Sequence, residues 1–382
     1  MHREKGKIRI LYIVTSCKKT GPIQQTLSII KNLDIDEFEP ILVTLYDEET
    51  DGTSQLSQYL KYVDHFFVRT SKSDILLGKR EILEMAIDRI KPDIIHSLGV
   101  FPDYAIAKFH KYPHIITLHN YIWDDYPMMY GRIKGGILAR LHLYVMDHTS
   151  ETVTCSESLS IIYRKKTGKS FRFIRNGVDI SSISDIPGDE RNKVRKELAI
   201  PLDAVVLVYS GKFIKRKNQE FLIKAFDVGL KQANAKLLLL GDGPEYGRLK
   251  NVYGSNQNII FKGNVLDVGR YLKACDIYVS TSKSEGMPYG VLEAMAAGLP
   301  VLLSDIMQHK EIMKADSDIG FLYRKDDLMD LSKKLKKIID CNFVEMGQHS
   351  YSVAYNQFSA IRMSREYQEK YKELVARNSK NK

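Results

Sequence analysis

The sequence has 382 residues, of which 44% are hydrophobic and 27% are charged. These proportions are typical of soluble globular proteins and exclude intrinsic disorder and collagen-like repeats. Its 4 cysteines are too few and too scattered for a disulfide framework, and no CxxC pair supplies a zinc site of that spacing. The net charge of +10 admits nucleic acid, an anionic membrane surface or phosphorylated small molecules as partners without choosing among them.

The amino-terminal segment predicts neither a signal peptide nor a membrane span. Residues 1–7 are rich in charge, and the apolar run 8–14 is interrupted by Arg9 and lacks a small-residue cleavage site. That run is therefore typical of a first strand. No stretch approaches the ~18 consecutive apolar residues of a spanning helix. We expect a cytoplasmic protein, and a peripheral position on the inner face of the plasma membrane stays open.

The first half of the chain alternates short apolar runs with helical patterns. Residues 8–15 form the first run, and 79–90 carry apolar residues on one face at helical spacing. Alternation of strands and helices in this way predicts a parallel sheet that is covered on both faces. The further predicted strands are 41–46, 65–69, 93–97, 114–119 and 152–156.

A second series of strands and helices begins near residue 204, after a Ser-, Pro- and Gly-rich segment at 180–191 that is typical of a linker. The fold class we predict is α/β, with two doubly wound domains, 1–185 and 186–358, followed by a helical segment, 359–382. Such sheets bind ligands beyond the carboxyl ends of their strands, so we expect a ligand cleft between the domains. The predicted strands of this series are 204–210, 235–240, 258–262, 277–281 and 300–304, and the predicted helices are 218–230, 244–253, 267–274, 290–297, 326–339 and 360–376.

The most informative segment is 284–301, which reads SEGMPYGVLEAMAAGLPV. It follows a predicted strand, and it places Pro288 where a helix begins and Gly298 where that helix ends. A helix N-terminus at the carboxyl edge of a sheet offers free N–H groups and a positive dipole to a diphosphate. Glu285 precedes the first turn and Glu293 lies about one turn inside, so the pair is placed for two parts of one ligand. The alternative is a solvated glutamate before an ordinary amphipathic helix.

A basic glycine turn follows another predicted strand. Gly211 allows the backbone to turn sharply, and Lys212 and Lys217 then reach the same cleft. Two cations beside a diphosphate stabilise the charge that builds on a departing phosphate. A solvated basic loop and a nucleic-acid patch are the alternatives. Gly241 and Gly21 form similar strand-to-helix turns, but neither matches GxGxxG, so the sequence gives no support to a nicotinamide cofactor.

Among the histidines, His119 closes the predicted strand 114–119 at the edge that faces the expected cleft. It is placed to bond a phosphate or a sugar hydroxyl, and a structural histidine is the alternative. No residues have metal-ligand spacing, and no Ser or Cys lies in a GxSxG-type setting, so we predict no metal and no cofactor. The locally basic segment 131–175 also contains apolar residues. It fits either a surface for anionic lipid head groups or a core helix with a solvated face.

Taken together, these motifs resemble the retaining nucleotide-sugar glycosyltransferases of glycosyltransferase family 4, which have the GT-B fold. The block EGxPxxxxEAMAxGxPV is matched at every fixed position over 285–301, and Gly211-Lys212 with Lys217 is similar to the family's GK-x4-K element. Weaker likenesses are GDGP at 241–244, NGVD at 176–179 and Phe358-Ser359 before the last helix. The resemblance implies two Rossmann-like domains that face each other across a cleft. It also implies that the C-terminal helix crosses back to the N-terminal, acceptor-binding domain.

The resemblance further implies roles for individual residues. Lys212 and Lys217 would hold the donor diphosphate, Glu285 would contact the transferred sugar, and Glu293 the ribose hydroxyls. The implied catalytic residues are His119, Glu285 and Lys217. The implied donor-binding residues are Gly21, Gly211, Lys212, Lys217, Gly241, Met287, Pro288, Tyr289, Gly290, Val291 and Glu293.

The reaction so implied moves a hexose or N-acetylhexosamine from a nucleotide-diphosphate sugar to an acceptor hydroxyl with retention. UDP-sugars are favoured and GDP-mannose comes second. The expected acceptor is a saccharide or a lipid-linked saccharide in bacterial capsule, O-antigen or exopolysaccharide assembly, with no nucleic-acid partner. A GT-B phosphorylase or epimerase is the first alternative. A non-enzymatic basic protein that binds membranes or nucleic acid is the last, because it leaves 285–301 unexplained.

Overall fold

The computed structural model describes residues 6–50, 52–107 and 109–380. The chain forms two compact units, unit 1 (Met1–Asn176 with Ala360–Lys382) and unit 2 (Gly177–Ser359). The sequence placed the boundary after residue 185, whereas 177–185 belong to unit 2. The reason is that Ile183 in this Ser-rich segment is buried, and its side chain lies against Gly269 of unit 2.

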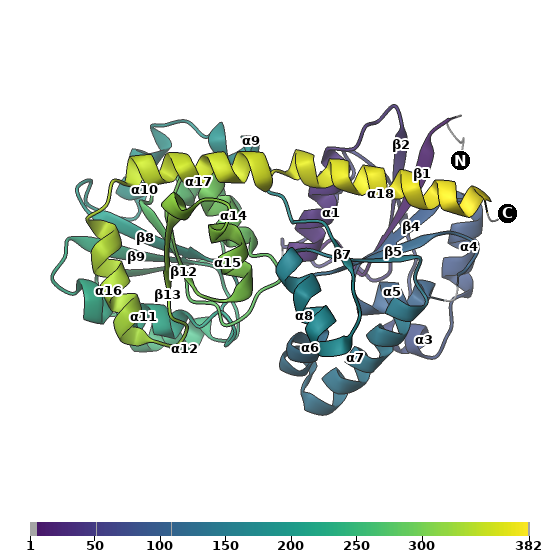
Figure 1. Ribbon diagram of the computed structural model, residues 1–382, viewed down its shortest axis with the longest axis horizontal. Coiled ribbons are helices and arrows are strands. Elements are labelled where there is room, and N and C mark those ends of the chain that lie inside the picture. The colour runs from purple at the N-terminus through teal and green to yellow at the C-terminus, as the bar shows by residue number, and fades with distance from the viewer. Residues whose placement is uncertain (1–5, 51, 108, 381–382) are drawn as a thin grey trace. The chain divides into compact units, whose positions relative to one another are not determined.

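Among its described residues, unit 1 forms a seven-stranded parallel sheet in the order β3-β2-β1-β4-β5-β6-β7 (Figure 1). Both faces of the sheet are covered, because alternate residues of the central strand enter two different cores. Tyr12 packs on one face against α1 and α18, and Ile13 packs on the other against α4 and α5. The strands are β1 (Ile8–Val14), β2 (Phe38–Thr44), β3 (Asp64–Phe67), β4 (Ile94–Ser97), β5 (His114–Leu118), β6 (Glu151–Thr154) and β7 (Arg172–Phe173).

The strands predicted for this half of the chain are all confirmed, and only the two-residue β7 was not predicted. The predicted helix 79–90 is α4, and the C-terminal helix α18 belongs to unit 1, as expected. Tyr371 of α18 is fully buried, and its hydroxyl lies 3.2 Å from that of Tyr12 and 2.7 Å from His96 Nδ1. The helices of unit 1 are α1 (Gly21–Lys31), α2 (Leu56–Tyr59), α3 (Lys72–Leu76), α4 (Glu81–Ile90), α5 (Val100–Ile106), α6 (Ile122–Tyr130), α7 (Arg132–Asp147), α8 (Glu157–Thr167) and α18 (Ala360–Lys380).

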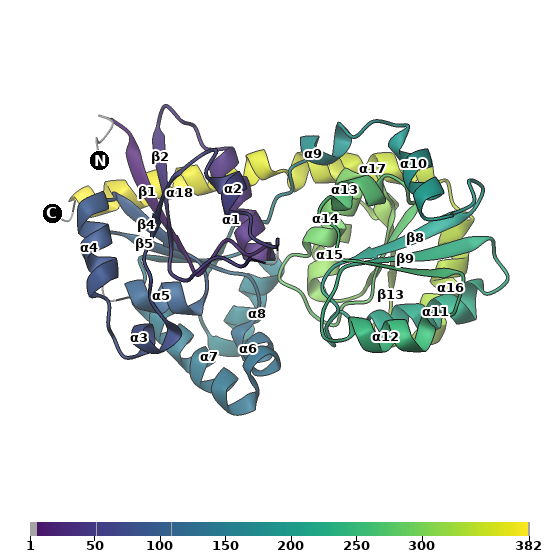
Figure 2. The ribbon, with the colours of Figure 1, turned by 180° about the vertical axis from the view of Figure 1, so that it is seen from behind.

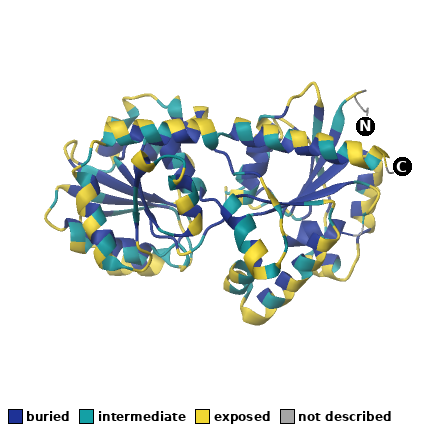
Figure 3. Cartoon of the chain, in the orientation of Figure 1, coloured by how far each residue is buried: buried dark blue, intermediate teal, exposed yellow. Residues whose placement is uncertain are grey.

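Unit 2 forms a second parallel sheet, six-stranded in the order β10-β9-β8-β11-β12-β13, with helices on both faces (Figure 2). Its central strands are buried, whereas the outer faces of its helices are exposed (Figure 3). The strands are β8 (Val205–Ser210), β9 (Ala235–Leu240), β10 (Ile259–Gly263), β11 (Ile277–Ser280), β12 (Val301–Ser304) and β13 (Gly320–Tyr323). The helices are α9 (Ser181–Ser184), α10 (Glu190–Glu197), α11 (Gln219–Leu230), α12 (Tyr246–Tyr253), α13 (Val268–Leu272), α14 (Tyr289–Ala296), α15 (Met307–Met313), α16 (Leu328–Ile339) and α17 (Phe343–Gln357), with a 3₁₀ turn at Ser317–Ile319.

Every strand predicted for unit 2 is confirmed, but β13, α9, α10, α15 and α17 were not predicted. Helix α17 lacks the stripe of large apolar residues that reveals a helix in sequence. Its buried positions include Gly347, Ser350 and Ala354, and a Cβ at position 347 would lie 2.1 Å from the carbonyl oxygen of Gly298. Small residues thus let α17 approach the end of α14 closely. Across the described part of the chain, no helix combines the length and apolar character needed to cross a bilayer.

Candidate active site

The loops after β8 and β11 lie at the point where the strand order of unit 2 reverses. Strands β8 and β11 are neighbours in this sheet. The chain runs from β8 to β9 on one side of the pair and from β11 to β12 on the other side. Open α/β sheets bind ligands at the carboxyl ends of strands at such a switch point. The loop after β8 carries Lys212 and Lys217, and the loop after β11 carries Glu285. The sequence motifs therefore meet where the topology leaves room for a ligand.

Two glycines bring the backbones at this edge into direct contact. Gly241, after β9, has φ +122°, and a Cβ there would lie 2.1 Å from the carbonyl oxygen of Gly211. Gly290, in the first turn of α14, faces the end of β8, and a Cβ there would lie 2.5 Å from the Tyr278 hydroxyl and 2.8 Å from the Ser210 carbonyl oxygen. Only glycine permits either approach. These positions thus set the helix N-terminus of α14 directly against the switch point.

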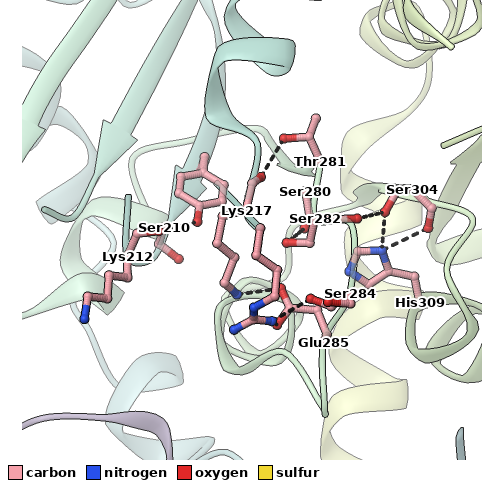
Figure 4. Close-up of polar contacts among 12 residues, drawn as sticks. Ser210, Lys212, Lys217, Ser280, Thr281, Ser282, Ser284, Glu285, Ser304 and His309 are labelled. Carbon is pink, nitrogen blue, oxygen red and sulfur yellow. Dashed lines mark hydrogen bonds and ion pairs between the residues drawn. The ribbon is translucent and has the colours of Figure 1, made fainter. Parts of the chain in front are cut away.

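The centre of the site is an ion cluster of two cations on one buried carboxylate (Figure 4). Lys217 Nζ lies 2.5 Å from Glu285 Oε1, and Arg216 Nη1 lies 3.0 Å from Glu285 Oε2. Arg216 also donates to the carbonyl oxygen of Ser284, at 2.5 Å. The Glu285 side chain is only 5% exposed. Because the cluster carries two positive charges and one negative charge, it retains a net positive charge for an anionic ligand.

Backbone hydrogen bonds hold the two loops of the cluster together. The Thr281 hydroxyl donates to the carbonyl oxygens of Lys217 and Asn218, at 3.1 and 2.9 Å. The N–H of Lys283 donates to the carbonyl oxygen of Arg216, at 2.8 Å. Asn218, at φ +56°, turns the chain into α11 immediately after Lys217. The cations and the carboxylate are therefore positioned by rigid loop backbone as well as by their mutual attraction.

Electrostatics fixes the charge of Glu285. Burial on its own would raise the pKa of this carboxyl, but the charges of Lys217 and Arg216 outweigh burial and lower it to about 2. Hydrogen bonds from Lys217 and Ser282 act in the same direction. Glu285 is therefore an anion at neutral pH and acts as a charge or a hydrogen-bond acceptor rather than as a general acid.

A buried histidine, which the sequence did not single out, borders the cluster. His309 Nδ1 donates to the Ser304 carbonyl oxygen at 2.9 Å, and the Ser304 hydroxyl donates to the Ser282 carbonyl oxygen at 2.6 Å (Figure 4). His309 Nε2 is buried and has no hydrogen-bond partner among the described residues. Burial lowers the pKa of His309 to about 4, despite the opposing charge of Glu285. The ring is therefore neutral at pH 7, and Nε2 presents a lone pair.

The remaining predicted site residues of unit 2 lie outside the ion cluster. Lys212 is exposed, and its side chain extends away from Glu285 (Figure 4). Within the described residues no acidic group pairs with it. Glu293 lies half-buried in the second turn of α14, which begins directly after Pro288. At the start of this helix, the amide of the predicted donor-binding residue Val291 donates to the Pro288 carbonyl oxygen at 3.1 Å.

In unit 1, the predicted residues lie at the carboxyl edge of the sheet. His119 follows β5, and its Nε2 is buried with no hydrogen-bond partner in the described part of the chain. Burial lowers the pKa of His119 to about 4, and the charge of Asp103 offsets this only in part. Gly21 begins α1 directly beyond β1, where Thr20 makes no side-chain cap. This edge therefore offers a neutral imidazole and an uncapped helix N-terminus.

Potential metal ligands gather elsewhere. Among the described residues, the carboxylates of Asp316 and Asp318 and the imidazole of His349 lie close enough together to hold an ion. They are partly exposed, and they belong to the 3₁₀ turn and α17 rather than to the Glu285 cluster. Exposed acidic groups of this kind are common without a metal. The absence of a metal from the reaction stays a prediction.

Comparison with known proteins assigns the class. The model of Glycosyltransferase Family 4 matches residues 24–182, and that of Glycosyl transferases group 1 matches 190–356. The O-antigen biosynthesis glycosyltransferase WclY of Escherichia coli is 24% identical over 376 residues, which are 96% of this chain and 99% of that protein. The UDP-Gal:alpha-D-GlcNAc-diphosphoundecaprenol alpha-1,3-galactosyltransferase of Escherichia coli is 26% identical over 402 residues, covering 98% of this chain and 99% of that protein.

The solved structures show the same fold. HepE of Anabaena in complex with UDP and glucose has a TM-score of 0.79 and 19% identity, covering 96% of this chain and 100% of that chain. The protein is thus a glycosyltransferase with the GT-B fold. It belongs to glycosyltransferase family 4, glycosyl transferases group 1, which confirms the resemblance of its motifs.

The ion cluster predicts an acid-sensitive contribution to stability. The folded-state pKa of Glu285, about 2, lies below its ordinary value of 4.5, so ionised Glu285 stabilises the fold above pH 4.5. This contribution is lost as the pH falls from about 4.5 to about 2, and it amounts to roughly 3 kcal/mol. Urea unfolding at pH 6 and pH 3 should therefore show a smaller pH dependence in Glu285→Gln than in the wild type. Equal dependence in both proteins would contradict the low pKa.

Proposed function

We propose that the protein is a retaining glycosyltransferase that moves a hexose or N-acetylhexosamine from a nucleoside-diphosphate sugar to an acceptor hydroxyl. A UDP-sugar is the favoured donor and GDP-mannose the second. The observation that carries the proposal is the net positive cluster of Arg216, Lys217 and Glu285 beside the N-terminus of α14. The donor named for the galactosyltransferase relative and the UDP and glucose bound to HepE support a UDP-sugar.

In the proposed reaction, cations stabilise the departing diphosphate. Lys217 and Lys212 bind its oxygens together with the first amides of α14, at Tyr289 and Gly290. The bond between the sugar C1 and the phosphate oxygen breaks, and C1 forms a bond to the acceptor oxygen on the same face. The acceptor proton passes to the leaving phosphate oxygen, so retention needs no protein nucleophile. Cationic side chains supply the charge stabilisation, and we propose that no metal is required.

The carboxylates and the histidine of the proposed site have separate roles. Glu285, fixed as an anion, contacts the transferred sugar and stabilises positive charge at C1. Glu293 accepts hydrogen bonds from the ribose hydroxyls. His119, neutral at pH 7, forms a hydrogen bond near the sugar and the phosphate, and Gly21 lets the backbone approach the phosphate. Met287, Pro288, Gly211 and Gly241 shape the donor site.

The experiment that tests this proposal is a thermal-shift screen of the purified protein against UDP-glucose, UDP-galactose, UDP-N-acetylglucosamine and GDP-mannose. A donor that binds the folded state raises the apparent Tm. The stabilising donor is then incubated with and without saccharide acceptors, and the anomeric configuration of the product is read by NMR. Full activity after EDTA treatment is expected. Rapid release of free sugar and nucleotide without any acceptor, or no stabilisation by any donor, would contradict the proposal.

We further propose that the acceptor is lipid-linked and that unit 1 attaches peripherally to the cytoplasmic face of the plasma membrane, in surface-polysaccharide assembly. The α6–α7 hairpin presents Met129, Ile133 and Ile137, which are 61%, 81% and 60% exposed. Cationic residues are interspersed with them, and α7 contains no acidic residue before Asp147. An exposed apolar face whose α7 part carries only positive charge before Asp147 fits the surface of anionic lipid.

Introducing negative charge on this face should weaken vesicle binding. In Ile133→Glu/Ile137→Glu, two apolar side chains are replaced by anions, and co-sedimentation with phosphatidylglycerol vesicles should fall at least about tenfold. The control is Leu266→Glu in unit 2, where the native residue is 82% exposed. If both variants bound these vesicles as the wild type does, the α6–α7 surface would not be the attachment site.

A further inference from the structure

A cavity within unit 1 is bordered by a buried arginine that nothing in the donor chemistry uses. The cavity has a volume of about 350 Å3 and lies among α3, α4 and α5. This volume is within the range of small-molecule sites. Its lining residues are Leu76, Leu77, Gly78, Arg80, Glu84, Tyr104 and Phe109. Neither His119 nor any member of the Glu285 cluster is among them.

Arg80 is the polar group around which the cavity is built. It is only 8% exposed, and its Nε is fully buried without a hydrogen-bond partner among the described residues. The guanidinium lies over the ring of Tyr104, with Cζ 5.0 Å from the ring centroid. This stacking holds the planar group in place but leaves the N–H donors at its edge unused. An arginine keeps its proton, so a buried guanidinium without a counter-ion is stabilised further when an anion binds it.

The neighbouring charges do not satisfy Arg80. Glu84 borders the cavity and is exposed, and within the described residues neither it nor any other carboxylate forms an ion pair with Arg80. Asp74 pairs with Lys79 at 3.3 Å, and the buried Asp103 accepts from Ser97 at 2.6 Å and bonds His142 at 3.0 Å. The acidic groups of α3 and α5 are thus already engaged. Arg80 is therefore left without an ion-pair partner among the described residues.

The helix that begins at the cavity adds hydrogen-bond donors. Arg80 is the N-cap residue of the ten-residue α4, and no side chain caps this N-terminus. The free N–H groups of the first turn lie beside the buried guanidinium, and the acidic residues of this turn, Glu81 and Glu84, are exposed. Leu76, Leu77, Tyr104 and Phe109 supply apolar and aromatic walls. An anionic ligand that also carries an apolar group matches both features.

We propose that this cavity, called here the Arg80 pocket, binds a small organic anion, a phosphate or carboxylate attached to an apolar moiety. The anion pairs with Arg80, and the apolar moiety packs between the leucines and the aromatic rings. Either a soluble metabolite or a lipid head group has this chemistry. The pocket is a second ligand site of the chain, separate from the one that holds the nucleotide sugar.

The test measures binding of phenyl phosphate by calorimetric titration to the full-length protein. Arg80→Met keeps the length and apolar character of the side chain and removes the charge, and it should raise the Kd at least tenfold. Arg89→Met, an exposed arginine on the same helix, should change the Kd less than twofold. The same titrations in Lys217→Met should give the same Arg80 dependence, which separates the pocket from the donor site. Benzyl alcohol, which lacks the charge, should not bind.

Two further measurements test whether Arg80 has only a structural role and which kind of ligand the pocket binds. Because Arg80→Met removes a buried charge that lacks a partner, its Tm without ligand should equal or exceed that of the wild type. A lower Tm together with unchanged binding of phenyl phosphate would show a purely structural arginine and overturn the proposal, as would no binding to the wild type. Octyl phosphate below its micellar concentration separates the two ligand sources. Tighter binding than phenyl phosphate assigns a lipid head group, and weaker binding assigns a soluble anion.

Discussion

Lys217→Met should lower kcat/KM for the sugar donor by about 10²–10³-fold, which is the usual cost of removing one preorganised group that stabilises developing charge. The lysine is held 2.5 Å from Glu285 and is 18% exposed, so it is positioned before the donor binds. Its positive charge stabilises the negative charge that develops on the phosphate as the C1–O bond breaks. The effect should appear mainly in kcat, measured with the donor identified by thermal shift.

The control for Lys217→Met is Lys215→Met, two residues earlier in the same loop. Lys215 is exposed and outside the cluster, so its loss removes the same charge from the loop without touching Glu285. We expect kcat/KM within about twofold of the wild type, because exposed charges contribute little. Arg216 keeps Glu285 paired in the Lys217 variant, so the fold should survive, and a Tm measurement checks this. Similar activities of the two variants would show that only the overall charge of the loop matters.

The sequence predicted the location of this site because its signals are local. Strand, glycine turn and helix follow one another at 205–230 and at 277–296, and parallel strands bring their carboxyl ends to one edge. The sequence could not show which basic residue of the run Lys215-Arg216-Lys217 turns inward. The structure partly buries the second and third, and both contact Glu285, although sequence reasoning did not select Arg216. Only packing decides that choice.

The other features that the sequence did not predict also depend on contacts between segments that are distant in sequence. His309 carries no motif, and its position beside Glu285 depends on the hydrogen bond that joins Ser304 of β12 to Ser282 after β11. Composition places the domain boundary after residue 185 because it counts the serines of 177–185 and overlooks the buried Val178, Ile180 and Ile183. Arg80 resembles any exposed arginine in sequence, and its burial follows from the stacking on Tyr104.

The two carboxylates of the 285–301 block should differ in kinetics as they differ in environment. Glu285→Gln should lower kcat by about 10²–10³-fold with little change in the KM for the donor, because an anion fixed near C1 acts chiefly in the transition state. Glu293→Gln should raise the donor KM about tenfold and leave kcat within about threefold, because a hydrogen bond to the ribose is made equally in the ground state. Separate kcat and KM values from initial rates distinguish the two.

Glu285→Gln keeps the size of the side chain, but it leaves Lys217 and Arg216 facing an amide. The extra unneutralised charge should tighten binding of free nucleoside diphosphate while turnover falls. A merely structural role for Glu285 would weaken nucleotide binding and turnover together, and the titration of the inactive variant with UDP separates these cases. A Glu293→Gln protein with the larger loss in kcat would reverse the assignment. The nucleotide-binding role would then belong to Glu285, whose two cations would serve to hold it toward the ribose rather than toward C1.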